Sequence, residues 1–136
     1  MSLVGKKFEY TKKVTDEDIR LFAQVSGDHN PLHLDDEYAK TTMFGRRIAH
    51  GMISASFISA AIAMEIPGEG TTYLSQNLQF KKPVFPGDTL KVTLEITDLQ
   101  EKSKFSIATV STVVENQDGD IVTQGEAKII PSKDAL

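Results

Sequence analysis

Residues 26–33, SGDHNPLH, place an aspartate, an asparagine, a proline and two histidines within eight positions. A carboxylate beside an imidazole can hold a water molecule and move protons, because histidine titrates near pH ~6.5. Asp28 and His33 are five positions apart, so on a continuous helix they would point about 140° away from each other. A turn at Asn30 and Pro31 would instead interrupt the helix and bring both side chains into one pocket.

A structural interpretation of the same segment stays open. In it Asp28 caps the turn, Asn30 fills the position before a proline that Asx turns favour, and His33 is a surface or half-buried histidine. If the segment is catalytic, Asn30 either fixes the turn or orients the water. A metal site built from His29, His33 and Asp35 is a third alternative, weakened by the proline between the two histidines. We expect no metal.

The segment RIAHGMISAS holds a second feature that could do chemistry. Gly51 lies immediately before an apolar helix expected over residues 52–64, so its N–H is among the donors that a helix leaves unsatisfied at its N-terminus. A glycine also lets a ligand approach the backbone closely. Such an N–H can polarise a carbonyl oxygen, as in an oxyanion hole. The alternative is a glycine that only allows the chain to turn or pack.

Composition narrows the functional classes. The chain of 136 residues is 40% hydrophobic and 25% charged, which is typical of one globular domain over residues 1–136. A net charge of −4 and scattered lysines and arginines argue against a nucleic-acid partner. Because the chain has no cysteine, disulfides, thiolate nucleophiles, zinc fingers and iron–sulfur clusters are excluded.

Two segments bear on localisation. The start, MSLVGKKFEY, lacks the apolar core of a signal peptide, so we expect a cytoplasmic protein. Residues 48–64 are mostly apolar, but His50, Gly51 and three serines interrupt a run that is barely long enough to cross a bilayer. We therefore expect a helix buried in a protein core and no membrane partner.

The first half of the chain is expected to form one strand and a helical region. The strand is predicted over residues 8–14. A helix then begins after Thr15, which forms a capping box with Asp18, and it ends at Gly27. A short helical turn is predicted over residues 35–40.

Residues 52–64 have small or apolar side chains on every face of the expected helix, which implies burial all round. Alternating patterns predict the strands that wrap it, over residues 72–80, 90–96, 105–115 and 121–130. This order argues for an α+β fold in which a curled antiparallel β-sheet wraps around a long central helix. One face of the sheet stays uncovered, so we predict a homodimer.

Three segments, FAQVSGDHNPLHLDDEYA, HGMISASFIS and YLSQNLQFKKPVFPGD, resemble the successive signatures of the MaoC-like (R)-specific enoyl-CoA hydratases. The resemblance covers about Thr15 to Ile130, and its most specific part is Gly-Asp-x-Asn-Pro-x-His at residues 27–33. It implies a single hot-dog fold and a dimer whose sheets join. It also implies reversible addition of water to a trans-2-enoyl-CoA to give the (R)-3-hydroxyacyl-CoA, with no cofactor beyond the CoA of the substrate.

Carried over position by position, the resemblance implies that Asp28 and His33 form the catalytic pair. Gly51 becomes the backbone donor to the thioester oxygen, and Ser59 a pocket residue near the aspartate. His29 lies at a position that the pattern leaves open and receives no role. We favour His33 as the base, with Asp28 holding the water and giving a proton to C2, and the exchanged roles stay open. As the acid, Asp28 would have to be buried to hold its proton.

Other expectations concern the two ends of the substrate. The acyl tail is expected to lie along the central helix, with Ile58 and Ile62 as candidates. Lys81 and Lys82 either contact the CoA phosphates or form a solvated strand end. The rival functions are a 3-hydroxyacyl-ACP or specialised acyl-CoA dehydratase, a hot-dog thioesterase, and a non-catalytic acyl-CoA-binding module. The motif at residues 27–33 argues against the last two.

Overall fold

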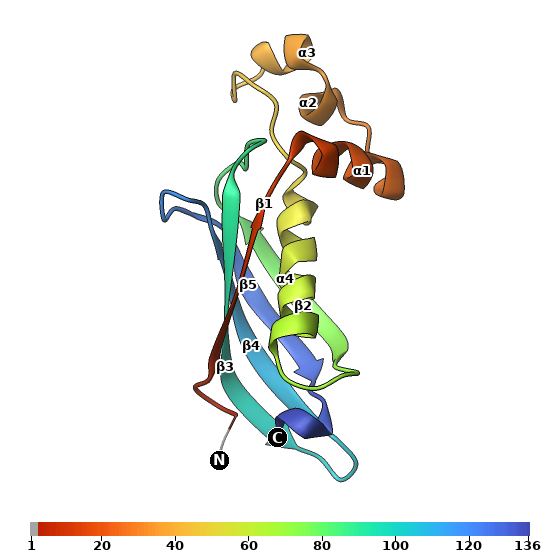
Figure 1. Ribbon diagram of the computed structural model, residues 1–136, viewed down its shortest axis with the longest axis vertical. Helices are drawn as coiled ribbons and strands as arrows, with labels where there is room; N and C mark the ends of the chain where they lie inside the picture. Colours follow the sequence, from red (N-terminus) through yellow and green to blue (C-terminus); the bar gives the residue numbers. More distant parts are fainter. Residues whose placement is uncertain (1–2) are drawn as a thin grey trace.

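A long helix lies lengthwise against one curled antiparallel sheet in the computed structural model, which describes residues 3–136 (Figure 1). In chain order the elements are β1 (Lys7–Lys13), α1 (Asp16–Ser26), α2 (Pro31–Leu34), α3 (Asp36–Lys40), α4 (Gly51–Glu65), β2 (Thr72–Phe80), β3 (Thr89–Glu101), β4 (Ser106–Glu115), β5 (Ile121–Ile130) and the 3₁₀ turn η1 (Lys133–Ala135). The three shorter helices, α1 to α3, gather at one end of the molecule, beside the start of α4.

The sheet has the strand order β1-β3-β4-β5-β2, and every neighbouring pair is antiparallel. β1 and β2 are therefore its two edges. β4 lies at the centre, where the fully buried Val110 faces Ala127 of β5, and Val114 faces Val92 of β3. Alternating apolar residues along these strands point toward α4, which contributes Ile53, Phe57, Ile58, Ala61 and Ile62 to the core. The predicted α+β architecture is confirmed.

The start and end of α1 follow the local signals in the sequence. Thr15 Oγ1 accepts from the Asp18 N–H at 3.0 Å, and Asp18 Oδ2 accepts from the Thr15 N–H at 3.0 Å. This capping box satisfies two donors at the helix start. Gly27 ends the helix in the left-handed conformation, with φ 81°. Both predicted boundaries of α1 are confirmed. After Gly27 the chain enters the turn that holds Asp28 and Asn30.

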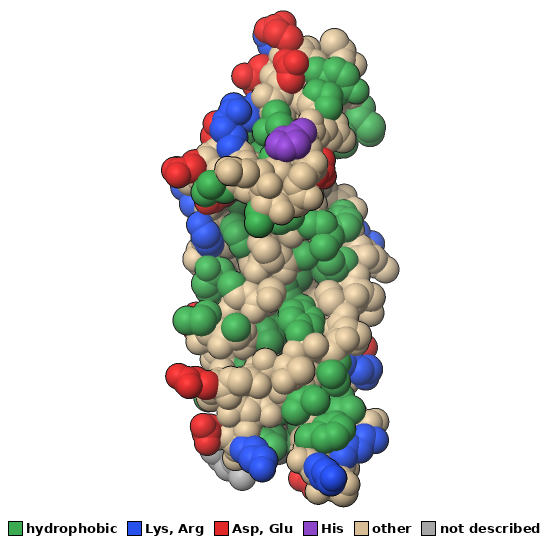
Figure 2. Space-filling view, turned by 90° about the vertical axis from the view of Figure 1, so that its right-hand side faces the viewer, with side chains coloured by type: hydrophobic (Ala, Val, Ile, Leu, Met, Phe, Trp, Pro, Cys, Tyr) green, Lys and Arg blue, Asp and Glu red, His purple; other side chains and the backbone are tan. Residues whose placement is uncertain are grey.

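The expectation that the central helix is buried all round is wrong for the single chain. Met52 and Met64 of α4 are 54% and 74% exposed. The sheet covers one side of α4 only. Because apolar residues surround the helix, its sequence does not indicate which side is left exposed. Figure 2 shows hydrophobic side chains gathered over one face of the molecule, and exposed apolar residues of β2 include Tyr73, Leu74 and Phe80. The described residues of one chain leave this apolar face uncovered.

Two boundaries near the site also differ from expectation. Gly51 is the first residue of α4, and His50 is its N-cap, so the helix begins one residue earlier than predicted. Pro31 opens a short additional helix, α2, as its first residue. Proline is well suited to this position because the first helical N–H has no partner within the helix. Among the described residues, no helix is long and apolar enough to cross a membrane.

Candidate active site

The turn between α1 and α2 is held by its own side chains. Asp28 Oδ1 accepts from the Asn30 N–H at 3.1 Å. Asn30 Oδ1 accepts from the Leu32 N–H at 3.1 Å, which makes Asn30 the N-cap of α2. Of the two roles considered for Asn30, the structure supports the one that fixes the turn. The turn sends the chain back so that α2 presents His33 on the side of Asp28.

Asp28 and His33 are brought together as the turn chemistry predicts. A carboxylate oxygen of Asp28 and a ring nitrogen of His33 lie within 4.8 Å of each other. Among the described residues, no direct hydrogen bond joins the two side chains. Two hydrogen bonds of about 2.8 Å to a common oxygen can span such a separation. The pair is therefore spaced to share one water molecule.

The imidazole of His33 is held in one tautomer. Its Nδ1 lies 2.8 Å from the backbone oxygen of Ile48. A carbonyl oxygen only accepts, so Nδ1 carries the proton and Nε2 of the neutral ring keeps a free lone pair. His33 is only 7% exposed, and burial lowers its pKa below the ordinary value of 6.5, against the opposing effect of the Ile48 bond. His33 is therefore neutral and able to accept a proton near pH 7.

Asp28, by contrast, is exposed in the single chain. An aspartate that serves as the acid would have to be buried, and one chain alone does not bury Asp28. The turn lies at the molecular surface, because the short helices form a projection beyond the end of the sheet (Figure 1). Burial of Asp28 would have to come from a bound substrate or from a second copy of the chain.

Gly51 opens α4 next to a packed aromatic ring. A Cβ built on Gly51 would lie 3.0 Å from Cδ1 of Phe80, which is closer than side chains normally approach. As the first residue of α4, Gly51 has an N–H that the helix itself leaves unsatisfied, and among the described residues no other acceptor takes it. The glycine therefore permits close contact with Phe80 and leaves a donor at the helix start.

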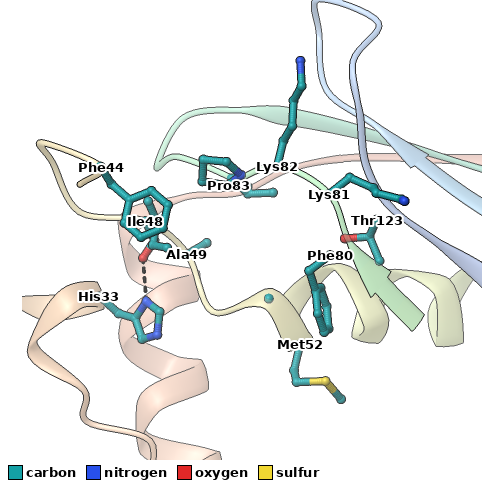
Figure 3. A pocket seen from close by; sticks show the side chains of 12 residues that line it. His33, Phe44, Ile48, Ala49, Met52, Phe80, Lys81, Lys82, Pro83 and Thr123 are labelled. Carbon is teal, nitrogen blue, oxygen red and sulfur yellow. Dashed lines mark hydrogen bonds between the residues drawn. The ribbon is translucent and has the colours of Figure 1, made fainter. Parts of the chain in front are cut away.

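A cavity of about 420 Å³ lies between the projection and the sheet. Its walls include both His33 and Gly51, whereas Asp28 is not part of them. Figure 3 shows His33 and Phe44 on one side and Met52 and Phe80 on the other. The cavity is mainly apolar, and Lys81 and Lys82 follow Phe80 at its wall, with their ammonium groups directed away from His33.

Three residues predicted for the site lie elsewhere in the single chain. Ile58 and Ile62 are 0% and 2% exposed, belong to the core, and do not line the cavity. The apolar wall of this cavity comes instead from Ile48, Met52 and Phe80. Ser59 is exposed, two helical turns along α4 from Gly51, so within one chain it does not join Asp28.

The possible metal ligands that lie together in the structure differ from the set His29, His33 and Asp35 considered in the sequence. Among the described residues, Asp28, His33 and His50 form the group whose ligand atoms lie within 4.8 Å of one another. Asp35 instead caps α3, where its Oδ1 accepts from the Glu37 N–H at 3.0 Å. Nδ1 of His33 and Nε2 of His50 are already engaged by backbone oxygens, which leaves one nitrogen of each ring for any other role.

Two further residues near the site, His50 and Arg47, could not be assigned a role there from the sequence. His50 is buried, and its ring stacks on that of His33 with centroids 4.0 Å apart. Arg47 donates to Asp16 at 2.6 Å, to Asp36 at 2.7 Å and to the backbone oxygen of His33 at 3.2 Å. The guanidinium thereby lowers the pKa of Asp16 and ties α1, α2 and α3 together. Neither residue shows a signal in the sequence, because the partners are distant along the chain.

Comparison with known proteins places the chain in a family. It matches the model of the MaoC like domain over residues 3–119. It is 43% identical over 127 residues to the (R)-specific enoyl-CoA hydratase of Rhodospirillum rubrum, covering 93% of this chain and 85% of that protein. The (R)-specific enoyl-CoA hydratase of Aeromonas caviae is 42% identical over 126 residues, with coverage of 93% and 92%.

The fold agrees with this relationship. The unliganded R-hydratase of Pseudomonas aeruginosa superposes with a TM-score of 0.86 at 52% identity, over 95% of this chain and 81% of that one. A curled five-stranded sheet along a central helix is the hot-dog fold implied by the resemblance at residues 27–33. The chain therefore belongs to the MaoC-like domain family.

Proposed function

We propose that this protein adds water reversibly to a trans-2-enoyl-CoA and forms the (R)-3-hydroxyacyl-CoA. The observation that carries the proposal is the separation of the Asp28 carboxylate and the His33 ring, within 4.8 Å, beside an apolar cavity. The names of the relatives from Rhodospirillum rubrum and Aeromonas caviae support the same reaction. The (R) configuration rests on those names and on the motif at residues 27–33.

The reaction proceeds by acid and base catalysis on one water molecule. His33 Nε2 takes a proton from the water, and the oxygen of the water forms a bond to C3 of the substrate. The electrons of the C2–C3 double bond move toward the thioester, which becomes enolate-like, and C2 takes a proton from Asp28. The proton on His33 then passes back to the Asp28 carboxylate, so that the net change is the addition of one water.

The developing charge on the thioester oxygen needs a donor. The Gly51 N–H supplies it, because no acceptor among residues 3–136 takes this group and the helix dipole favours negative charge there. Gly51 and His33 line the same cavity, which lets one bound thioester reach both. The acyl group lies among the apolar side chains of Phe44, Met52 and Phe80.

The CoA moiety of the bound substrate extends out of the cavity beside Lys81 and Lys82. Lys82 forms an ion pair with Asp120 at 3.4 Å, whereas no carboxylate among the described residues pairs with Lys81. Lys81 is therefore the cation with a free charge at the cavity wall. We assign it to the CoA phosphates, and the protein needs no further cofactor.

The protein acts as a homodimer that joins through β2. An edge strand has unpaired N–H and C=O groups, and lysines on an edge discourage pairing. β1 has three lysines in seven residues, KFEYTKK, whereas β2 has none and exposes Tyr73, Leu74 and Phe80. Pairing through β2 would also cover the exposed side of α4, including Met52 and Met64.

One assay separates this function from its rivals. The protein is incubated with crotonyl-CoA, and both the enoyl absorbance and the release of free thiol are followed. Loss of absorbance without thiol release supports hydration, and chiral analysis of the product tests the (R) assignment. Thiol release would indicate a thioesterase. Activity on the corresponding acyl-carrier-protein substrate only would indicate the dehydratase alternative, and inactivity on both would contradict catalysis.

A further inference from the structure

His50 makes a hydrogen bond to the main chain of Asp28. It is the N-cap of α4 and is 3% exposed. Its Nε2 lies 3.0 Å from the backbone oxygen of Asp28, which only accepts, so Nε2 carries the proton and donates. The bond links residues 22 positions apart. It joins the turn between α1 and α2 directly to the start of α4, which includes Gly51.

The ring of His50 also contacts His33, the other member of the proposed catalytic pair. It stacks on His33 with ring centroids 4.0 Å apart and planes inclined by 33°. On another side it packs against Phe22 of α1, at 4.9 Å. His50 therefore fixes the backbone of Asp28 and restricts the ring of His33 with a single side chain. It does so from the residue that precedes Gly51, the assigned donor to the thioester oxygen.

His50 is a poor choice for stability alone. Asparagine, aspartate and serine are favoured at an N-cap because their side chains satisfy the first N–H groups of the helix. In the described part of the chain, the side chain of His50 makes no such bond to α4. Within residues 3–136 its buried Nδ1 also has no hydrogen-bond partner, which costs free energy that an apolar ring would avoid. Residues that break local rules in this way are concentrated at functional sites.

We infer that His50 is a positioning residue for the proposed hydration, one that holds Asp28 and His33 at the separation needed to share a water. It acts through those two residues, whereas Gly51 acts on the substrate. Displacement of a catalytic group by about 1 Å can lower a rate about 100-fold. Removing the hydrogen bond from His50 to the Asp28 backbone should therefore lower kcat and leave KM nearly unchanged. The inference rests on the proposed function.

Two amides at position 50 provide the sharpest comparison. In H50Q the side-chain NH₂ can lie where Nε2 of the histidine lies, and it can donate to the Asp28 oxygen. In H50N the NH₂ is one carbon nearer the backbone and cannot reach it, although asparagine is a favourable N-cap. We expect H50N to lower kcat on crotonyl-CoA about 10- to 100-fold with KM changed less than about 3-fold. We expect H50Q to keep kcat within about 3-fold of the wild type.

Thermal unfolding separates positioning from general support of the fold. H50N should have a Tm no lower than that of H50Q, because asparagine can cap α4. Phe57→Leu is the matched control, since Phe57 is a buried residue of α4 whose ring packs on Tyr10. It should lower Tm and leave kcat within about 2-fold. If H50N does not fold, H50F replaces it, because phenylalanine keeps the ring and lacks the donor.

The outcomes distinguish the two levels of the proposal. An active wild type with an equally active H50N, or equal losses in H50Q and H50N that follow their Tm values, would overturn the role of His50 alone. A wild type that hydrates no enoyl thioester would overturn the proposed function itself.

Discussion

The Nδ1 atom of His33 donates to the backbone oxygen of Ile48 at 2.8 Å. Ile48 belongs to the segment that leads into α4, and its neighbour Ala49 donates to the Val84 oxygen at 2.7 Å. The tautomer of His33 is therefore set by a backbone segment fixed on the sheet side. This relationship leaves Nε2 as the proton acceptor and makes His33 the base in the proposed reaction.

The pH dependence of kcat/KM should show this base. Burial lowers the pKa of His33 below 6.5, so the neutral ring persists below that pH in the free enzyme. We expect kcat/KM to fall on the acid side with an apparent pKa below 6.5. The same shift reduces the free energy of unfolding as pH falls below 6.5, because the unfolded chain binds the proton first. An acid limb at or above 6.5 would contradict the assignment of His33.

Removing either member of the pair should abolish most of the activity while leaving the fold intact. We expect D28N and H33Q each to lower kcat by at least about 100-fold, within the scale of acid–base groups. H29Q is the matched control, because His29 is an exposed histidine beside Asp28 with no assigned role. It should retain wild-type kcat. Near-normal turnover in D28N or H33Q, measured well below Tm, would contradict the catalytic pair.

Much of this architecture could be predicted from local patterns. The capping box at Thr15, the stop at Gly27 and the alternating strands of the second half all depend on neighbours in the sequence. The position of β5, Ile121–Ile130, was predicted to the residue. The convergence of Asp28 and His33 could be predicted as well, because Asn30 and Pro31 determine the turn between them.

Features that depend on distant partners could not be predicted. The apolar residues of α4 surround the helix, so no periodicity indicated which side faces the sheet. Ile62 consequently seemed available to the substrate, although it lies in the core. His50 and Arg47 act on residues far along the chain, and a lone histidine or arginine carries no sign of such a partner. The exposure of Asp28 follows from the projection of α1 to α3, which is a tertiary property.

Lys81 should affect binding of the CoA moiety and not the chemical step. We expect K81A to raise KM for crotonyl-CoA about 5-fold, with kcat nearly unchanged, because an exposed ion pair contributes about 1 kcal/mol. Crotonyl-N-acetylcysteamine lacks the phosphates, so its KM should not change. K91A is the control, since Lys91 is an exposed lysine of β3. Equal KM changes with both substrates would contradict phosphate binding by Lys81.

The predicted dimer can be tested at its proposed edge. Leu74 is an exposed apolar residue of β2, and L74E would place like charges near each other where two copies of this strand meet. Light scattering at micromolar concentration should give a dimer for the wild type and a monomer for L74E. I121E changes an exposed residue beyond the end of the β2 pairing and should remain dimeric. A monomeric wild type would contradict the dimer.

The most direct test of the shared water is the double variant D28N/H33Q, compared with both single variants on crotonyl-CoA. If both groups act on one water, removing the second costs little once the first is gone. We therefore predict that kcat of the double variant is at most about 10-fold below that of the slower single variant. Independent groups would multiply their losses, and two reductions of about 100-fold would give about 10⁴. A multiplicative loss in kcat would contradict a common water activated by Asp28 and His33.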